Sequence, residues 1–309
     1  MDLSIIIVNW NTRDMMRDCL DTVYAGLGTL TAEVFVVDNG SDDGSQAMVR
    51  SRFPDAQLIE NTENRGFAAA NNQALALARG RHVLLLNSDT LVHGQVMPAS
   101  VRYLDNNPQV GVMGCRVLNT DGTLQKTCSM YPTLTNLALQ ATGLSRLPGA
   151  VFDRYRMERW DRTDTRAVDV VSGCYLMARR AAIDTVGLLD ESFFFYGEET
   201  DWCRRFADAG WALMFAPVGE ITHFGGGSVR KLNHRRDVLL TEGTVRLHRK
   251  HGGRVGGAAC WALLAAFNAV RAVVWTGLSV TGQPAARTRA AHFRAVTAAL
   301  GDAWHRQAG

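Results

Sequence analysis

The chain has 309 residues, which is enough for two domains or for one large α/β domain with an extension. Hydrophobic residues make up 47% and charged residues 20% of the sequence, which excludes disordered, collagen-like and coiled-coil proteins. Thirty-three Lys and Arg against 30 Asp and Glu leave a net charge of +3, too small to favour nucleic acid as a partner.

The first ninety residues alternate strand signals with helix signals. Residues 3–8 form a largely β-branched run without alternation of polar and apolar residues, which is typical of a central parallel strand buried on both faces. Residues 14–24 have apolar side chains at helical spacing. This alternation predicts an α/β fold with a doubly wound, mostly parallel sheet, whose ligands are expected outside the carboxyl ends of the strands. The remaining predicted elements of this half are a strand at 34–37, a helix ending near 52, a strand near 58–59, a helix at 68–78 and a strand at 83–86.

The regular alternation ends near residue 100. A turn signal at 119–122 predicts a hairpin between strands at 110–117 and 124–128. We therefore expect three parts: 1–100, an α+β part at 101–235, and a C-terminal helical extension at 236–309. The other predicted features are a less regular stretch at 131–166, a strand at 168–178, helices at 179–186 and 198–209, a glycine run at 225–227, a basic helix at 237–251 and an apolar helix at 258–278.

Cysteine usage and the N-terminus bear on the cellular compartment. The cysteines form no C-x-x-C pair and no metal-ligand spacing, so we expect small core residues in a reducing environment and no disulfide framework. The N-terminus has no basic region and only a short apolar run before Asn9, which predicts a cytoplasmic protein without a signal peptide. The six cysteines are Cys19, Cys115, Cys128, Cys174, Cys203 and Cys260.

Polar residues cluster where the predicted parallel strands end, at 9–11, 38–43 and 87–89. Because these ends meet at one edge of a parallel sheet, we expect one composite site. Asp38 can accept hydrogen bonds from a base or a ribose there, or it can cap the following turn. Asp89 is suited to hold a divalent ion against a diphosphate, with an Asx turn as the alternative interpretation.

Common nucleotide-binding fingerprints do not explain this site. Neither G-x-G-x-x-G nor the P-loop sequence follows the first strand, so the dinucleotide-binding and P-loop classes are disfavoured. Glu198, Glu199 and Asp201 instead crowd the start of a helix after an aromatic run, an arrangement suited to a general base. His223 is a candidate neutral metal ligand, with a structural histidine as the alternative interpretation.

Seven segments taken together resemble the family 2 glycosyltransferases, in particular the bacterial rhamnosyltransferase-like members with the GT-A fold. The segments lie in the family's order and span most of residues 3–252. They are 4–11, 36–45, 64–72, 84–90, 172–177, 194–205 and 223–228.

The resemblance implies inverting transfer of a sugar from a nucleotide diphosphate donor, with 1–100 binding the donor and 101–235 carrying the acceptor site and the catalytic base. It implies that Asp38 binds the donor's base and that Asp89 and His223 hold Mg²⁺ or Mn²⁺. The donor-binding positions that we infer from it are Asn9, Asp38, Asn39, Arg65, Gly66, Phe67, Asn71, Asn87 and Ser88, and the acceptor-side positions are Gly173 and Trp202.

Two positions depart from the family pattern. The metal motif begins with Asn87, which leaves Asp89 as its only carboxylate, and the base position holds Glu199 where an aspartate is usual, so Glu198 stays a rival for that role. The resemblance is closest to enzymes that use dTDP-rhamnose and lipid-linked or polysaccharide acceptors in cell-envelope glycan synthesis, with UDP-sugars open. The alternative functions are a nucleotidyltransferase and a non-catalytic nucleotide-sugar-binding module.

The apolar helix at 258–278 points to a membrane surface. Asn268 and Arg271 lie inside it, which argues against a membrane-spanning helix, and basic residues flank it. We expect it to lie in the interface of the cytoplasmic membrane face as a peripheral anchor. Packing on the catalytic part, or on a second copy of the chain in a homo-oligomer, is the alternative. Its predicted apolar positions are Trp261, Leu264, Ala265, Phe267, Val270, Val274 and Trp275.

Overall fold

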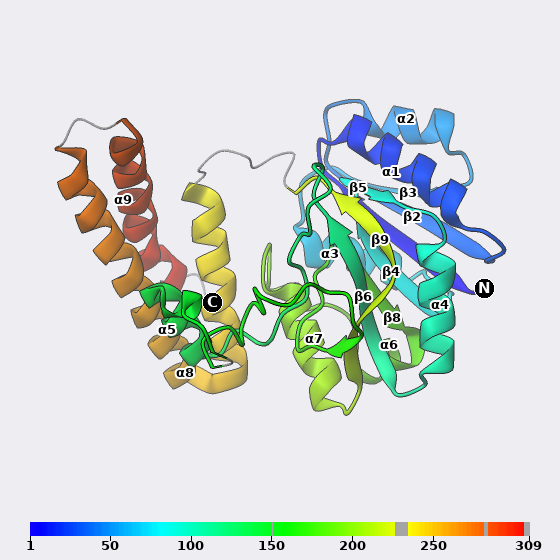
Figure 1. Ribbon diagram of the computed structural model, residues 1–309. Helices are drawn as coiled ribbons and strands as arrows, with labels where there is room; N and C mark the ends of the chain where they lie inside the picture. Colours follow the sequence, from blue (N-terminus) through cyan, green and yellow to red (C-terminus); the bar gives the residue numbers. More distant parts are fainter. Residues whose placement is uncertain (150, 226–233, 281–283, 306–309) are drawn as a thin grey trace. The chain divides into compact units, whose positions relative to one another are not determined.

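The computed structural model describes residues 1–149, 151–225, 234–280 and 284–305, with side chains as far as residue 301 (Figure 1). These residues form two compact units. The first contains 1–131, 156–194 and the chain from 198 onward to 225, and the second contains 132–155, 195–197 and the C-terminal helices. The predicted glycine run extends beyond residue 225 and so lies mostly outside the described residues. The boundaries predicted at 100 and 235 stay predictions.

The first unit is built on one mixed sheet whose strand order is β3-β2-β1-β4-β8-β6-β9-β5, with β7 paired to β9. The four strands β3, β2, β1 and β4 are parallel, as the sequence predicts, whereas β8 runs antiparallel to both of its neighbours. The strands are β1 (Leu3–Asn9), β2 (Ala32–Asn39), β3 (Gln57–Asn61), β4 (His82–Asn87), β5 (Thr90–Val92), β6 (Val110–Leu118), β7 (Arg166–Ala167), β8 (Tyr175–Arg179) and β9 (Ala212–His223).

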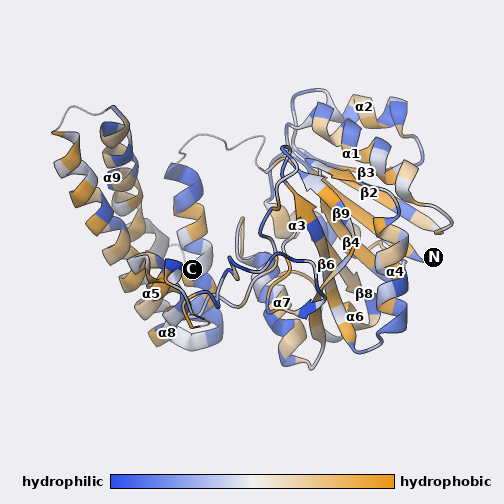
Figure 2. Ribbon diagram, viewed as in Figure 1, coloured by the Kyte–Doolittle hydropathy of each residue, from blue (hydrophilic) through white to orange (hydrophobic). Residues whose placement is uncertain are grey.

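Helices cover both faces of this sheet. Ile5 and Ile7 of β1 pack with the helices α1, α2 and α4, while Ile6 between them packs with α3, α6 and α7 on the opposite face. Burial on both faces explains the apolar runs within β1, β2 and β4, and Figure 2 shows much of the sheet as hydrophobic ribbon. The helices are α1 (Arg13–Gly26), α2 (Ser45–Arg52), α3 (Phe67–Leu75), α4 (Val96–Asn106), α6 (Arg180–Val186) and α7 (Glu198–Asp208).

Two predicted strands differ in the structure. Residues 124–128 contribute an isolated bridge between Leu124 and Leu118 and no full strand, although the turn before it forms as predicted. The strand predicted from residue 168 begins at Tyr175, because the backbone turns at Ser172, whose carbonyl accepts a hydrogen bond from the Tyr175 N–H at 3.3 Å.

The second unit is helical. It contains α5 (Leu134–Thr142), the 3₁₀ turn η1 (Leu144–Arg146), α8 (His234–Ser279) and α9 (Pro284–His305). Gly253 has φ 65° and ψ −169°, so α8 consists of two helices that meet there. Leu137, Val245 and Cys260 form the buried centre of this unit. All six cysteines are buried and free, as expected for core residues.

Candidate functional site

The carboxyl ends of β1, β2 and β4 lie side by side, because Asn9 pairs with Asp38 in the sheet and Val8 pairs with Asn87. Asn9 Nδ2 donates to Asp38 Oδ2 at 2.9 Å, and Asn9 Oδ1 accepts from Thr12 Oγ1 at 2.7 Å. Thr12 Oγ1 also lies 2.9 Å from Ser88 Oγ. The structure therefore joins the three predicted donor-binding positions Asn9, Asp38 and Ser88 in one hydrogen-bonded network.

Asp38 lies beneath the surface of this edge. Its side chain is fully buried, and its Oδ1 accepts hydrogen bonds from the Ser41 N–H at 2.9 Å and from Gln46 Nε2 at 2.6 Å. These bonds fit the turn-capping interpretation, since the carboxylate is already hydrogen-bonded within the protein. Direct contact between Asp38 and a nucleotide base stays a prediction.

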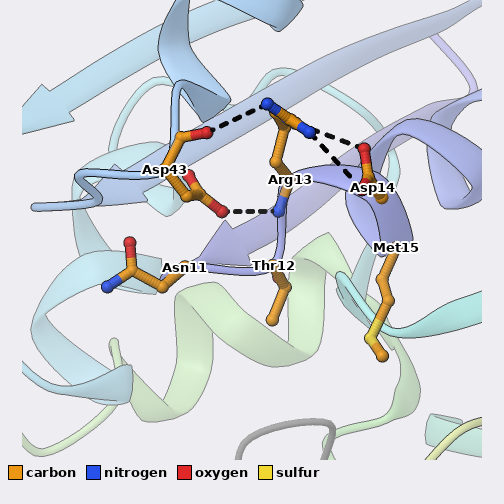
Figure 3. A pocket seen from close by; sticks show the side chains of 6 residues that line it. All are labelled: Asn11, Thr12, Arg13, Asp14, Met15 and Asp43. Atoms are coloured by element: carbon orange, nitrogen blue, oxygen red, sulfur yellow. Dashed lines mark hydrogen bonds and ion pairs between the residues drawn. The ribbon is translucent and has the colours of Figure 1, made fainter.

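A cavity of about 310 Å³ lies beside this network, at the start of α1. Figure 3 shows Arg13 between Asp43 and Asp14: its backbone N–H donates to Asp43 Oδ2 at 2.8 Å, and its Nε donates to Asp14 Oδ1 at 3.2 Å. Asn11, Thr12 and Met15 complete the lining. The cavity contacts the network through Thr12 and does not include the predicted metal ligands.

Asn39 shapes the loop that precedes α3. Its Oδ1 accepts from the Arg65 N–H at 3.0 Å, and its Nδ2 donates to Asn64 Oδ1 at 2.9 Å and to the Gly66 carbonyl at 3.2 Å. Asn39 is buried and Arg65 is exposed. Asn39 is thus a loop-positioning residue here, and the side chain of Arg65 is exposed at the surface.

Gly66 occupies a backbone conformation that favours glycine, with φ 83° and ψ 171°. A Cβ at this position would lie 2.5 Å from the Phe194 carbonyl oxygen, which accepts a hydrogen bond from the Phe67 N–H at 3.0 Å. A Cβ on Gly173 would lie 3.5 Å from the Phe67 ring. Phe67 therefore lies beside two further segments of the resemblance. Asn71 is buried and donates to the Phe67 carbonyl one helical turn before it, which is a structural role.

Asp89 and His223 meet because β5 and β9 pair with Thr90 opposite His223. Asp89 Oδ1 lies 3.2 Å from His223 Nε2, and the two side chains are 13% and 15% exposed. Asn87 Nδ2 lies 3.3 Å from the same nitrogen. The structure therefore brings together both predicted metal ligands with the first residue of the predicted metal motif, at a place that solvent reaches.

The donor set of this pair fits a divalent cation. The amide of Asn87 donates toward Nε2, which marks Nε2 as the ring nitrogen that carries a lone pair. That lone pair faces a carboxylate oxygen of Asp89, so a cation would relieve the repulsion between the two electron-rich atoms. Among the described residues no group of three or more His, Cys, Asp or Glu side chains is arranged to hold a metal, so oxygens from a ligand and from water would complete the coordination.

Glu198 and Glu199 begin α7 in different environments. Glu198 is 4% exposed and Glu199 is half-buried. Burial raises the pKa of Glu198 well above the usual value for a glutamate, and the nearby charge of Glu199 raises it further. Glu198 Oε2 has no hydrogen-bond partner among the described residues. The arrangement favours a protonated Glu198 beside Glu199.

The segment 171–174 lies between α7 and the end of β4. The Val171 N–H donates to Cys203 Sγ in α7 at 3.4 Å, and the Cys174 carbonyl accepts from the Asn87 N–H at 3.3 Å. This segment therefore connects the helix that carries Glu199 with the strand end that carries the metal motif. Gly173 lies at its centre.

Trp202 corrects one expectation. We predicted it on the acceptor side, but it is completely buried, packs against Phe206 and donates from Nε1 to the Gly187 carbonyl at 2.8 Å. Its burial excludes contact with an acceptor in this structure, so it is a packing residue. Its position on α7, one turn after Glu198, explains this burial, because a helix at the sheet surface turns one face into the core.

Sequence reasoning missed Gln125. Its Oε1 lies 2.7 Å from His223 Nδ1, across 98 positions of the chain. The predicted hairpin turn beside it was the available signal, but a turn signal gives no indication of its tertiary neighbours.

Comparison with solved structures supports the fold. A mannosyltransferase from Pyrobaculum calidifontis, solved with GDP-Man and Mn²⁺, aligns with a TM-score of 0.56 and 19% identity over 96% of this chain and 86% of that chain. GalNAc-T7, solved with UDP, GalNAc and Mn²⁺, aligns with a TM-score of 0.52 and 15% identity over 82% of this chain and 50% of that chain. At these identities the likeness establishes the fold alone.

Sequence comparison supports the family. An N-acetylglucosaminyl-diphospho-decaprenol L-rhamnosyltransferase of Mycobacterium tuberculosis is 27% identical over 224 residues, 66% of this chain and 71% of that protein. The low-salt glycan biosynthesis hexosyltransferase Agl10 of Haloferax volcanii is 25% identical over 66% of this chain and 61% of that protein. The model of the family described as Glycosyl transferase family 2 matches residues 4–187. This chain therefore belongs to glycosyl transferase family 2 and has the GT-A fold.

Proposed function

We propose that the chain is a metal-dependent, inverting glycosyltransferase that moves a sugar from a nucleotide diphosphate donor to a hydroxyl of a lipid-linked or polysaccharide acceptor. The observation that carries this proposal is the Asp89 and His223 pair, whose oxygen and nitrogen face one another at 3.2 Å beside the ends of the parallel strands. Family membership makes the nucleotidyltransferase alternative unnecessary.

Asp89 and His223 are the proposed protein ligands of the cation. When bound, a divalent cation there supplies positive charge that stabilises the departing diphosphate. A mixed carboxylate and imidazole set suits Mn²⁺ better than Mg²⁺, since Mg²⁺ prefers oxygen ligands. Two solved structures with this fold contain Mn²⁺, which supports the same choice. Thr12, which is hydrogen-bonded to Asn9 and Ser88, lies at the strand ends on the proposed donor side.

Glu199 is the proposed general base, which takes the proton of the acceptor hydroxyl as the sugar is transferred. A base must be ionised before it accepts a proton, and the raised pKa of the buried Glu198 favours its protonated form. The half-buried Glu199 is adjacent to it, in the helix that Cys203 joins to the segment 171–174. These environments favour Glu199 over Glu198.

The proposed donor is dTDP-rhamnose. The relative in M. tuberculosis is named as an L-rhamnosyltransferase that acts on a diphospho-decaprenol carrier, and the identity with it is 27% over 66% of this chain. The experiment is a screen of dTDP-rhamnose, UDP-sugars and GDP-mannose for release of nucleoside diphosphate with a polyprenyl diphosphate sugar as acceptor. We expect release with dTDP-rhamnose in Mn²⁺ and none in EDTA. Turnover with a UDP-sugar alone would overturn the donor assignment, and donor binding without any transfer would favour a non-catalytic module.

The proposed location is the cytoplasmic face of the membrane. By length and composition, α8 is the one described helix that could cross a membrane, and 17% of its most apolar stretch is buried. Its exposed apolar side chains include Val270, Val273, Val274 and Leu278, whose spacing places them along one side of the helix. Trp261, one of the predicted apolar positions, is hydrogen-bonded to a neighbouring helix: its Nε1 donates to the Leu300 carbonyl of α9 at 2.9 Å.

Two arginines lie over aromatic rings of α8. The Arg271 guanidinium lies 3.8 Å from the centre of the Phe267 ring, and that of Arg289 lies 4.5 Å from the Trp275 ring. Cationic guanidinium groups on a helix with exposed valines suit an anionic lipid surface. A peripheral membrane association would bring the enzyme to a lipid-linked acceptor. Covering of the same surface by a second copy of the chain is the competing outcome.

A further inference from the structure

The turn at 119–123 is hydrogen-bonded to His223 through Gln125. Thr123 Oγ1 donates to Asp121 Oδ1 at 2.6 Å and accepts from Asn119 Nδ2 at 2.9 Å. Asn119 Oδ1 accepts from Gln125 Nε2 at 2.9 Å, and Gln125 Oε1 lies 2.7 Å from His223 Nδ1. The turn and the proposed metal ligand thus share one continuous chain of side-chain hydrogen bonds.

The charge of Asp121 fixes the direction of every bond in this chain. A carboxylate only accepts, so the Thr123 hydroxyl must donate to it and must in turn accept from an amide N–H of Asn119. Asn119 then presents its oxygen to Gln125. The hydrogen bonds from the Thr123 hydroxyl and N–H lower the pKa of Asp121, which keeps this end of the chain ionised.

A second contact fixes the orientation of Gln125 independently. Gln125 Nε2 also lies 3.4 Å from the backbone carbonyl oxygen of His223, which only accepts. The nitrogen of the amide must therefore face that carbonyl, and the oxygen must face the imidazole. Gln125 Oε1 then requires a proton on His223 Nδ1, which leaves the lone pair of the neutral ring on Nε2, 3.2 Å from Asp89 Oδ1.

We propose that Gln125, held by Asn119, Thr123 and Asp121, is a positioning residue that fixes the tautomer and ring orientation of His223 for binding a divalent cation. This inference rests on the proposed function, in which His223 is a metal ligand. A histidine ligand commonly donates its second ring N–H to such a partner, and loss of that partner weakens metal affinity about 10-fold to 100-fold. Asp121 and its neighbours would thus contribute to the metal site without touching the metal.

The test uses the full chain with Gln125→Met, which keeps the length of the side chain and removes the strong acceptor. Gln73→Met is the matched control, because Gln73 is also a half-buried glutamine bonded to an asparagine, Asn61, at 2.9 Å. Binding of Mn²⁺ alone is measured from the EPR signal of free Mn²⁺. The tautomer of His223 is read in metal-free protein from the ¹⁵N shifts of its ring, assigned with His223→Gln.

We expect Gln125→Met to weaken Mn²⁺ binding about tenfold or more and to mix the tautomers of the neutral His223 ring, with Gln73→Met like the wild type in both. Thr123→Val, which leaves Gln125 in place, should change both readouts in the same direction and by less. A wild-type ring with its proton on Nε2, or a Gln125→Met variant with unchanged Mn²⁺ affinity, would overturn the inference. If His223→Gln leaves Mn²⁺ binding unchanged, the proposed metal site itself fails, which is a separate result.

Discussion

Replacing Glu198 and Glu199 by glutamine, one at a time, distinguishes the proposed base from the buried acid. Glu199→Gln removes the only proton acceptor that we assign to the chemical step. Loss of a positioned general base lowers rates about 100-fold to 10,000-fold. We therefore predict a fall in kcat of about a hundredfold or more, equivalent to about 2.7 kcal/mol of transition-state stabilisation, with the KM for the donor nearly unchanged.

Glu198→Gln should have a different signature. A protonated carboxyl and an amide are both neutral and similar in size, so we expect activity within a few-fold of the wild type. Burial and the charge of Glu199 raise the pKa of Glu198 in the folded protein. The contribution of protonated Glu198 to the free energy of unfolding is therefore fully present below the pKa of an unfolded glutamate, near 4.3. That contribution is lost as the pH rises through the higher pKa of the folded protein. The glutamine variant does not titrate, so its stability relative to wild type should rise with pH across that window.

Two measurements check this pair of predictions. Nucleoside diphosphate release under saturating donor gives kcat for both variants, and urea unfolding at a series of pH values gives the difference in free energy of unfolding between wild type and Glu198→Gln. An inactive Glu198→Gln beside an active Glu199→Gln would refute the assignment of the base. A difference in unfolding free energy that does not change with pH would refute the protonated state of Glu198.

Three further outcomes follow from the geometry. Gly66→Ala should lower the melting temperature more than Gly187→Ala. The two glycines share a backbone conformation (φ 83°, ψ 171° and φ 78°, ψ −174°), but only at Gly66 would the added Cβ lie 2.5 Å from a carbonyl oxygen. Equal losses would show that backbone strain alone determines the effect. Asp89→Ala should abolish turnover and His223→Ala should weaken it less, because a neutral ligand contributes less charge; full wild-type activity in EDTA would contradict both. Serine in place of Val270, Val273 and Val274 should abolish flotation with anionic liposomes, whereas flotation equal to that of the wild type, or a wild-type dimer that the variant loses, would contradict the membrane role.

The parallel half of the fold could be predicted because β1, β2 and β4 are buried on both faces. Ile5, Ile6 and Ile7 lie in two different core clusters, so the run is continuously apolar and is easily recognised. β9 was missed because Pro217 and Gly219 within it resemble a loop. The pairing of β6 with β9 is irregular across this stretch, which accommodates both residues in the strand.

The candidate site could be predicted only as far as strand ends indicate it. The pattern placed Asn9, Asp38 and Asn87 at one edge, and the sheet register places them there. The burial of Asp38 and the contact between Gln125 and His223 depend on tertiary contacts between segments that are far apart in the sequence. Local sequence contains no signal for such contacts.

The most direct test of the central claim is the position of the cation. A crystal of the chain grown with Mn²⁺ and a nucleoside diphosphate, measured at the manganese absorption edge, gives an anomalous peak at each bound manganese. We predict one strong peak within bonding distance of an Asp89 carboxylate oxygen and of His223 Nε2, about 2.0 to 2.3 Å from each. A manganese that binds diphosphate away from both side chains, or a nucleoside diphosphate bound at the strand ends without manganese, would contradict the proposed site.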